Sequence, residues 1–281
     1  MLETEKAEIV PFNLKTGEIV SGKILTPAMI QEIQRKKNKN RKINEEYKEY
    51  GNFYWLFYEM KEKLFSNTIS GDNITRVIYL ATYMDYKDNK LKYDNNVNIH
   101  KKDLMTLLNV KERKYYKFIK ECTNANILNI ENDETVTMSF KYFGKGKIKK
   151  LKNNKNIAIT RIYCDTIRYL YKNCKEKFYK NLSYLYIILP YINREYNILC
   201  NNPEEDDLEK IKCINMLQLC NIVGYNPKNS YRLKQSLKNI LIKDKPIVSW
   251  VDNANGEYIF INPNLYYAGT KHIEVKILGK F

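Results

Sequence analysis

Apolar residues recur along the chain with helical and strand spacing, and the elements they predict begin near residue 73. Within residues 73–83 the apolar positions follow an asparagine that is able to cap a helix. The predicted elements, in chain order, are a helix at 73–83, an extended piece at 97–99, helices at 100–108 and 111–122, and strands at 127–130 and 135–140. This order of helix, strand, two helices and hairpin is typical of a winged helix-turn-helix.

The same order of elements is predicted a second time, nearer the C-terminus. Gly224 suits a turn that needs a positive φ, and Pro227 suits the first position of a helix that Asn226 caps. The second series comprises a helix at 182–191 that ends or kinks at Pro190, an extended piece at 198–200, helices at 215–222 and 227–241, and strands at 247–251 and 258–262. Residues 101–121 can be laid against 214–236, but identity is low, so chance similarity of two amphipathic units is the alternative.

The repeated order predicts an α+β fold with tandem winged helix-turn-helix domains and a basic linker. The predicted divisions are an N-terminal hairpin and basic arm at 1–46, a first winged-helix domain at 47–143, the linker at 144–156 and a second winged-helix domain at 157–281. Three further elements are expected: a pair of strands within 8–22, an aromatic helix within 47–65 and a supporting helix at 157–173.

The chain is strongly basic, and the charge is concentrated in two runs. It has 48 Lys and Arg against 32 Asp and Glu, so a polyanionic partner is expected: nucleic acid first, an acidic membrane surface second. Part of the lysine reflects the codon usage of an AT-rich genome, which also explains the 24 tyrosines. However, Arg35–Lys42 and Lys145–Lys155 contribute +6 each to a net charge of +16, which uniform codon bias does not produce. We interpret both runs as phosphate-contacting arms; solvated, disordered connectors are the alternative.

The residues that catalysis or metal binding requires are sparse. His100 and His272 lie far apart, so the paired-histidine metal site of a rolling-circle nickase is excluded. The six cysteines form no CxxC pair, and residues 144–147 lack the frame of a phosphate-binding loop. No apolar stretch approaches the roughly 20 residues that span a bilayer, and the N-terminus resembles no signal peptide. We therefore expect a cytoplasmic protein with reduced thiols that is not an enzyme and uses no cofactor, metal or membrane partner.

Both predicted second helices carry side chains suited to DNA, because that helix lies in the major groove of a helix-turn-helix complex. The first offers Lys111, Arg113, Lys114, Lys117 and Lys120. The second offers Lys228, Asn229, Ser230, Tyr231, Arg232, Lys234 and Gln235. Other candidates are Lys145, Lys147, Lys149 and Lys150 of the linker and Asn253 and Asn255 of the last hairpin.

Among these candidates, Arg113 suits the O6 and N7 atoms of guanine, Asn229 and Gln235 suit adenine, and the lysines suit phosphate. The alternative is that both helices merely present their solvent faces. Two such units in one chain form a built-in dimer, expected to occupy two major grooves about one turn apart on an asymmetric or direct-repeat site.

Several segments resemble known replication proteins. Ile74–Tyr86 and His100–Val110 resemble the opening of the winged-helix domain in RepL-like replication proteins of Gram-positive plasmids. Phe260–Gly269 is similar to the INPxxxYxG close of such proteins and of related phage proteins, and residues 189–204 resemble phage and plasmid proteins of Firmicutes. Together the segments cover roughly residues 70–270. Two winged units depart from a single-unit RepL-like protein and are closer to iteron-binding initiators, whose two winged helices grip one repeat.

The resemblance implies an origin-binding initiator that bends or opens DNA and recruits host replication proteins without hydrolysing anything. We therefore predict a sequence-specific binder of double-stranded DNA, at origin or operator repeats of a plasmid or phage, acting as a monomer or homodimer. A transcriptional repressor, or a partition or conjugation factor, has the same binding chemistry and stays open. A winged-helix module that binds other proteins is the alternative from a different class.

Overall fold

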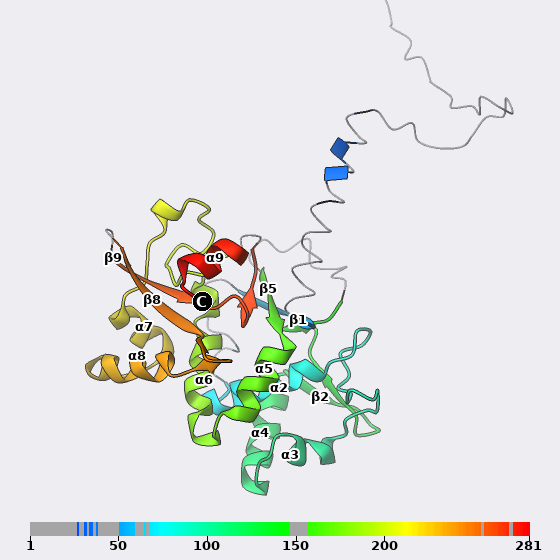
Figure 1. Cartoon of the computed structure of the whole chain (residues 1–281). Helices are drawn as coiled ribbons and strands as arrows, with labels where there is room; N and C mark the ends of the chain where they lie inside the picture. Colours follow the sequence, from blue (N-terminus) through cyan, green and yellow to red (C-terminus); the bar gives the residue numbers. More distant parts are fainter. Residues whose placement is uncertain are drawn as a thin grey trace, which may run out of the picture. The chain divides into compact units, whose positions relative to one another are not determined.

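A computed structural model describes residues 51–59, 65, 68–146, 157–253, 256–269 and 272–281, together with six positions between Pro27 and Asn38. The chain divides into two compact units, Met1–Glu49 and Tyr50–Phe281. All the helices and strands named below belong to the second unit, which has a mixed α+β architecture (Figure 1). The strand pair expected within 8–22 lies outside the described residues, as does most of the Arg35–Lys42 run.

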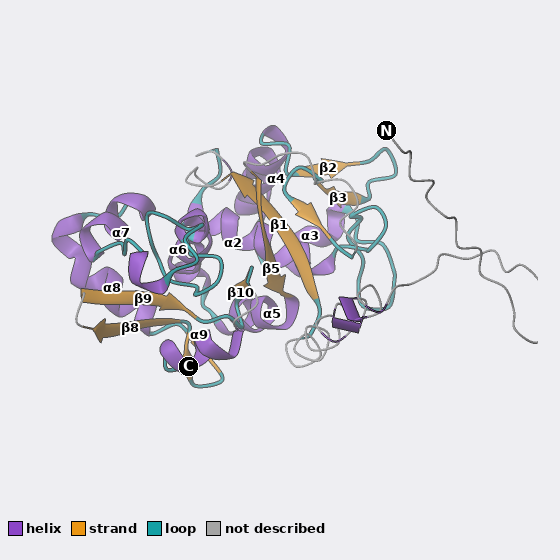
Figure 2. Ribbon diagram, turned by 90° about the horizontal axis from the view of Figure 1, so that it is seen from above, coloured by secondary structure: helices purple, strands orange, loops and turns teal. Residues whose placement is uncertain are grey.

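A four-stranded antiparallel sheet forms the centre of this unit (Figure 2). Its strands, in spatial order, are β10 (Tyr266–Tyr267), β5 (Ile157–Tyr163), β1 (Phe53–Glu59) and β4 (Phe143–Gly144). The two central strands pair along seven residues each, from Phe53 opposite Tyr163 to Glu59 opposite Ile157. The sheet therefore joins the first half of the unit, residues 51–146, to the second half, residues 157–281.

Two helix predictions are wrong at this sheet. The aromatic helix expected within 47–65 is instead β1, and the first part of the helix expected at 157–173 is β5, after which α5 (Cys164–Asn173) begins. Aromatic and β-branched residues favour strands, and both segments are rich in them. Tyr54 and Leu56 of β1 are fully buried, and so is Ile162 of β5. Trp55 and Phe57, which point to the opposite face from Tyr54 and Leu56, are also aromatic, so β1 lacks the polar alternation that identifies strands in a sequence.

Helices α2 (Gly71–Leu80) and α6 (Tyr179–Ile187) pack against each other and connect the two halves a second time. Their approach is close, because a Cβ atom added at Gly71 would lie 2.7 Å from Ser183 Oγ. Thr75 Oγ1 donates a hydrogen bond across this contact to the carbonyl of Tyr179, at 2.8 Å. Buried residues of both halves belong to one continuous hydrophobic core.

Both predicted series of elements are present in the chain. In the first half they are α2, α3 (Leu104–Leu107), α4 (Glu112–Asn124), β2 (Leu128–Ile130) and β3 (Val136–Met138). In the second half they are α6, α7 (Met216–Val223), α8 (Ser230–Lys238), β8 (Val248–Asn253) and β9 (Gly256–Ile261). The remaining elements are the short hairpin of β6 (Leu241–Ile242) and β7 (Lys245–Pro246), and α9 (His272–Leu278). The helix predicted at 227–241 is a 3-10 turn, Pro227–Asn229, followed by α8, and its last predicted residue begins β6.

The halves repeat each other in detail. Buried Asn89 and Asn197 both have a left-handed backbone, with φ of 57° and 52°. Each side-chain amide donates to the end of the hairpin's second strand and to an outer strand of the sheet: Asn89 to the carbonyls of Met138 and Phe143, and Asn197 to those of Ile261 and Tyr266. These matched contacts favour a duplicated unit over chance similarity of two amphipathic segments.

Candidate nucleic-acid interface

The turns that lead into α4 and α8 have the same geometry. Asn109 and Gly224 occupy the left-handed region, with φ of 50° and 68°. In both turns the amide of the following residue donates to the carbonyl five residues back, at 3.1 Å in the first half and 2.8 Å in the second. The next helical segment then starts three positions after the left-handed residue, at Glu112 in one half and Pro227 in the other. The two helix–turn–helix segments are therefore structurally equivalent.

Helix α4 buries one face and exposes a basic one. Tyr115, Phe118 and Cys122 point into the core. The residues exposed on and just before the helix include Lys111, Arg113, Lys114, Lys117 and Lys120. Arg113, Lys117 and Lys120 follow the i, i+4, i+7 spacing of a single helical stripe, opposite the buried residues. This stripe has the charge that a phosphate backbone requires and includes an arginine near the helix N-terminus.

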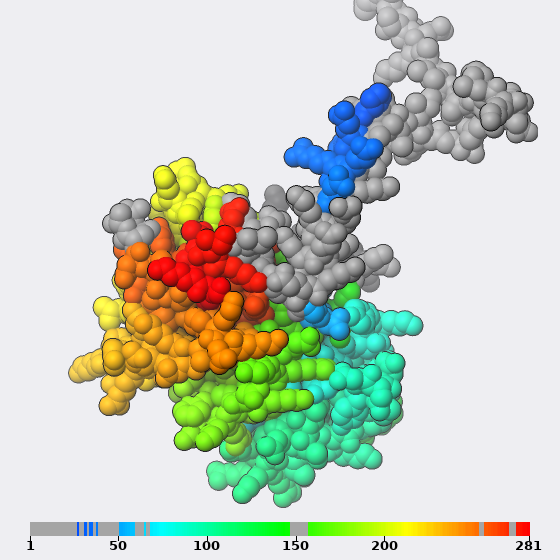
Figure 3. Space-filling view, in the orientation of Figure 1, coloured from blue at the N-terminus to red at the C-terminus, as the bar shows by residue number. Residues whose placement is uncertain are grey.

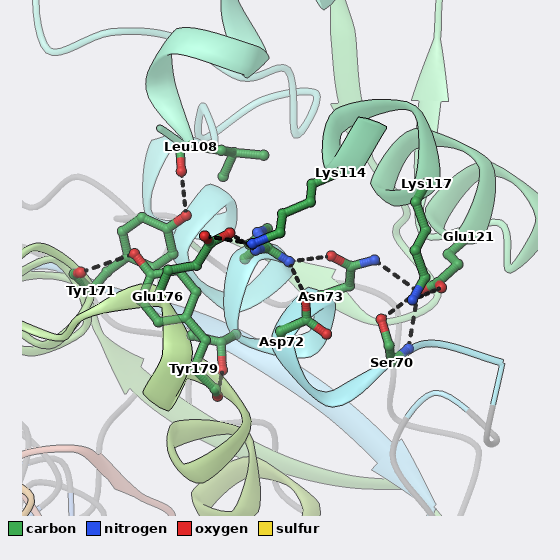
Figure 4. A network of polar contacts seen from close by, with 12 residues as sticks. Ser70, Asp72, Asn73, Leu108, Lys114, Lys117, Glu121, Tyr171, Glu176 and Tyr179 are labelled. Atoms are coloured by element: carbon green, nitrogen blue, oxygen red, sulfur yellow. Dashed lines mark hydrogen bonds and ion pairs between the residues drawn. The ribbon is translucent and has the colours of Figure 1, made fainter. Parts of the chain in front are cut away.

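Lys114 lies beside this stripe and is held by the second half (Figure 4). Its Nζ donates to Glu176 Oε2 at 2.6 Å, and Glu176 Oε1 accepts from the guanidinium of Arg76, also at 2.6 Å. Arg76 is only 1% exposed, and it donates as well to Asp72 at 2.6 Å and to Asn73 at 2.5 Å. Lys114, predicted as a DNA contact, is therefore also an ion-pair partner that joins α4 to α2 and the second half.

Glu121 anchors the other end of α4 in the same network. Its Oε2 accepts from the backbone amide of Ser70 at 3.0 Å, from Ser70 Oγ at 2.8 Å and from Asn73 at 2.8 Å. Burial alone would raise the pKa of Glu121, but these hydrogen bonds and the nearby Lys117 ammonium hold the pKa below its ordinary value. The carboxylate therefore stays ionised and fixes the orientation of the helix.

Helix α8 exposes a more mixed set of side chains. Leu233 and Leu237 are buried. Lys228, Asn229, Tyr231 and Arg232 are exposed, whereas Ser230, Lys234 and Gln235 are half-buried. Lys234 donates to Glu257 of β9 and lies over the ring of Trp250, with its Nζ 5.3 Å from the centroid. The ammonium of Lys234, like that of Lys114, is therefore paired within the protein.

Tyr116 was missed as a candidate, although its counterpart Tyr231 was predicted from the sequence. Tyr116 of α4 is 59% exposed, and Tyr231 of α8 is 72% exposed. Each stands seven residues after the left-handed residue of its turn, Asn109 or Gly224. Aligning the two turns in the sequence places Tyr116 on Tyr231, so the signal was available without a structure.

Four exposed lysines lie between the two helix–turn–helix segments, where α5 is followed by α6: Lys172, Lys175, Lys177 and Lys180. A groove of about 510 Å³ separates this junction from the end of α8 and is lined by Lys175, Phe178 and Ser236, among others. A second pocket of about 460 Å³ lies between the junction and the first turn, at Leu107 and Asn109. Figure 3 shows the green surface of this region between the orange of α8 and the blue-green of α3 and α4. We call these four residues the junction lysines.

Of the four lysines predicted as contacts in the linker, only Lys145 is among the described residues. Lys145 is half-buried, donates to the carbonyl of Met84 at 2.8 Å and lies over the ring of Tyr86. Burial lowers the pKa of its ammonium below the ordinary value. The ammonium of Lys145 is therefore engaged by Met84 and Tyr86 within the protein. Lys147, Lys149, Lys150 and Asn255 lie outside the described residues, and of Asn253 only the backbone is described.

The first hairpin is acidic at its tip. Glu131, Asp133 and Glu134 are exposed there. Asp133 accepts from the amide and hydroxyl of Thr135, at 3.0 and 2.6 Å, and these bonds lower the pKa of its carboxyl. The tip of the first hairpin therefore carries a cluster of exposed acidic side chains, which disfavours contact with phosphate. The equivalent tip in the second half, between β8 and β9, lies outside the described residues.

Within the described part of the chain, no group of three His, Cys, Asp or Glu residues is placed to hold a metal ion. Among the same residues, no helix combines the length and the apolar character needed to cross a membrane. Comparisons of the chain with protein-family models, with curated proteins and with solved structures give no match.

Proposed function

We propose that the chain is a sequence-specific double-stranded DNA-binding protein of the cytoplasm, with two winged helix-turn-helix units formed by α2 to β3 and by α6 to β9. One observation carries this proposal: two equivalent turns each lead into a helix with exposed basic and hydrogen-bonding side chains. Exposed side chains at the N-terminal part of such a helix are those that contact base edges in helix-turn-helix complexes. Replication initiation at the origin of a plasmid or phage is the leading task, on the strength of the resemblance described above.

The two units are expected to use different contacts. The acidic tip at Glu131, Asp133 and Glu134 disfavours approach of the first hairpin to phosphate, so the first unit binds through α4 alone. In the first unit Arg113 reads guanine, while Lys117 and Lys120 contact phosphate. In the second unit Asn229 and Gln235 are available to bind adenine, and the guanidinium of Arg232 supplies a positive charge. The junction lysines lie between the helices and are suited to the backbone between the two grooves.

Binding to fragments that tile the protein's own replicon, at near-physiological salt, tests the proposal. A large ratio of specific to non-specific affinity, on the order of 10³ or more, is expected for one fragment. Footprinting of that fragment separates the tasks: an array of repeats beside an AT-rich segment supports an initiator, and a single site over a promoter supports a repressor. Uniform weak binding to every fragment would overturn the proposal in favour of a protein-binding module.

Single substitutions test the assignment of helices. Arg113→Ala and Arg232→Ala should each reduce discrimination between the best fragment and a scrambled one, because a bidentate base contact contributes about 1–3 kcal/mol of discrimination. Lys141→Ala, an exposed lysine outside both helices, is the matched control and should leave that ratio unchanged. If all three variants keep the ratio of the native chain, α4 and α8 are not the recognition helices.

A further inference from the structure

The central sheet relates the two halves by an approximate two-fold axis. Leu56 of β1 pairs with Phe143 of β4, and Ile162 of β5 pairs in the same way with Tyr266 of β10. The neighbouring positions match too, since Trp55 is opposite Gly144 and Arg161 is opposite Tyr267. Strand β5 is thus the counterpart of β1, with Ile162 equivalent to Leu56 and Arg161 equivalent to Trp55.

The pairing between β1 and β5 has the symmetry that this equivalence requires. Trp55 and Arg161, which are equivalent to each other, are paired with each other. On one side of this pair Leu56 is opposite Thr160, and on the other side Tyr54 is opposite Ile162. Exchanging each residue with its counterpart converts one pair into the other. A two-fold axis through the Trp55–Arg161 pair, perpendicular to the strands, produces this exchange.

The same axis relates the elements outside the sheet. The strand order β10-β5-β1-β4 reads the same from either end when counterparts are exchanged. Helices α2 and α6 are counterparts and pack directly on each other. Figure 2 shows α7 and α8 at one end of the unit, away from α3 and α4, which lie near β1 in this view. A two-fold axis places equivalent atoms at the same height along itself, so α4 and α8 lie at the same level along this axis.

We infer that the DNA site of one chain is an imperfect inverted repeat, with one half-site read by α4 and the other by α8. This inference rests on the proposed function. Protein units related by a two-fold axis face the two strands of a duplex in opposite directions, so equivalent helices meet equivalent bases in inverted order. Half-site centres about 10 bp apart, or a multiple of the helical turn, are expected. This arrangement replaces the direct-repeat site expected from the sequence.

The inverted repeat is imperfect because equivalent side chains differ. The exposed tyrosines Tyr116 and Tyr231 are identical counterparts, so the bases beneath them should agree between half-sites. Lys120 of α4 has Gln235 of α8 as its counterpart. A lysine suits guanine or phosphate and a glutamine suits adenine, so the half-sites should differ at that position.

Selection of bound duplexes from a random library by the full-length chain, followed by sequencing, tests the inference. Two related half-sites in opposite orientation are expected, and the mass of the complex should correspond to one chain per pair of half-sites. Half-sites in the same orientation, or two chains per pair, would overturn the inference while leaving DNA binding intact. Enrichment of no sequence would overturn the proposed function, and the inference with it.

Reversal of one half-site in the best selected duplex provides a second test. It should weaken binding at least tenfold, because one helix loses its base contacts. Gln235→Ala should relax the base preference in one half-site only, and Arg113→Ala should relax it only in the other. Unchanged affinity after reversal, or relaxation of both half-sites by one substitution, would overturn the inference. Lys87→Ala, an exposed lysine in the loop after α2, is the control and should change neither half-site.

Discussion

Replacement of Arg76 by methionine tests how the two halves are held at α4. Methionine keeps most of the buried aliphatic length of the arginine and removes the guanidinium. That guanidinium, in a side chain that is 1% exposed, bonds to Asp72 and Glu176 at 2.6 Å each and to Asn73. It therefore connects α2 to the second half and, through Glu176, to Lys114 of α4.

The expected loss of stability follows from the exposure of the partners. Removing one member of a buried ion pair costs about 3–5 kcal/mol, mainly because the other member is left buried and uncompensated. Here the carboxylates of Asp72 and Glu176 are 40% and 37% exposed, so water partly compensates them. We therefore expect a loss near the lower limit, about 3 kcal/mol, which lowers the melting temperature by about 6–12 °C for a unit of this size.

Thermal and urea unfolding of the native chain and the Arg76→Met variant at pH 7 measure this loss. Lys117→Met is the matched control, because it removes an exposed partner of Glu121 and should cost less than about 1 kcal/mol. A melting temperature of Arg76→Met within about 2 °C of the native chain would show that the network adds no net stability.

The pH dependence of the same variant gives an independent check. Burial alone would raise the pKa of Asp72, but its hydrogen bond to Arg76 and the charge of Arg76 outweigh burial and lower that pKa. A lowered pKa in the folded state gives stability that is present above the unfolded value, about 4, and is lost as the pH falls through the folded value. The difference in stability between the native chain and Arg76→Met should therefore shrink below about pH 4. A constant difference from pH 7 to pH 3 would contradict this.

Three further predictions concern packing, phosphate contact and thiol chemistry. Gly71→Ala should lower the free energy of unfolding, measured in urea, by about 1–3 kcal/mol. Adding Ser183→Ala should recover part of this loss, because the new methyl group clashes with Ser183 Oγ. If the effects of the two substitutions on stability simply add in the double variant, the close contact is contradicted. Replacing the four junction lysines by Gln should reduce the slope of log affinity against log salt by up to about 3.6, at about 0.9 per phosphate contact, whichever DNA sequence is used. The matched control replaces four exposed lysines elsewhere and should keep the slope: Lys87, Lys141, Lys212 and Lys280. Burial raises the pKa of the half-buried Cys213 thiol to about 11. The alkylation rate of Cys213, followed by mass spectrometry, should therefore still rise about tenfold per pH unit between pH 8 and 9.5, because the thiolate is the reacting form. An alkylation rate that levels off near pH 8.5, the pKa of a free thiol, would contradict this.

The spacing of apolar residues in the sequence correctly predicted the amphipathic helices. It gave wrong predictions where both faces of a strand are apolar. Helix α4 agrees with its prediction because one face is apolar and the other is charged, which the sequence records directly. Strand β1 was predicted as a helix because aromatic and apolar residues occupy both of its faces, so the sequence lacks polar alternation. Local sequence carries no information on which strand lies on either side.

The sequence predicted which helices carry the candidate site, but not which of their side chains form ion pairs within the protein. The charged residues of α4 and α8 were named from the sequence, but the ion pairs that engage Lys114 and Lys234 join residues far apart in the chain. Such pairs depend on tertiary packing, which no helical pattern records. The junction lysines were also missed, because only the fold places the end of α5 between the two turns.

The two halves are joined by β1 and β5 of a single chain, and this has a consequence for how they vary. In a homodimer, one coding sequence supplies both subunits, so every substitution appears twice and equivalent positions stay identical. Here each half has its own codons, and Lys120 and Gln235 already differ at equivalent positions. The pairing of the halves is also intramolecular, so dilution does not separate them. The chain therefore keeps the geometry of a dimer at any concentration while each half remains free to acquire its own preference.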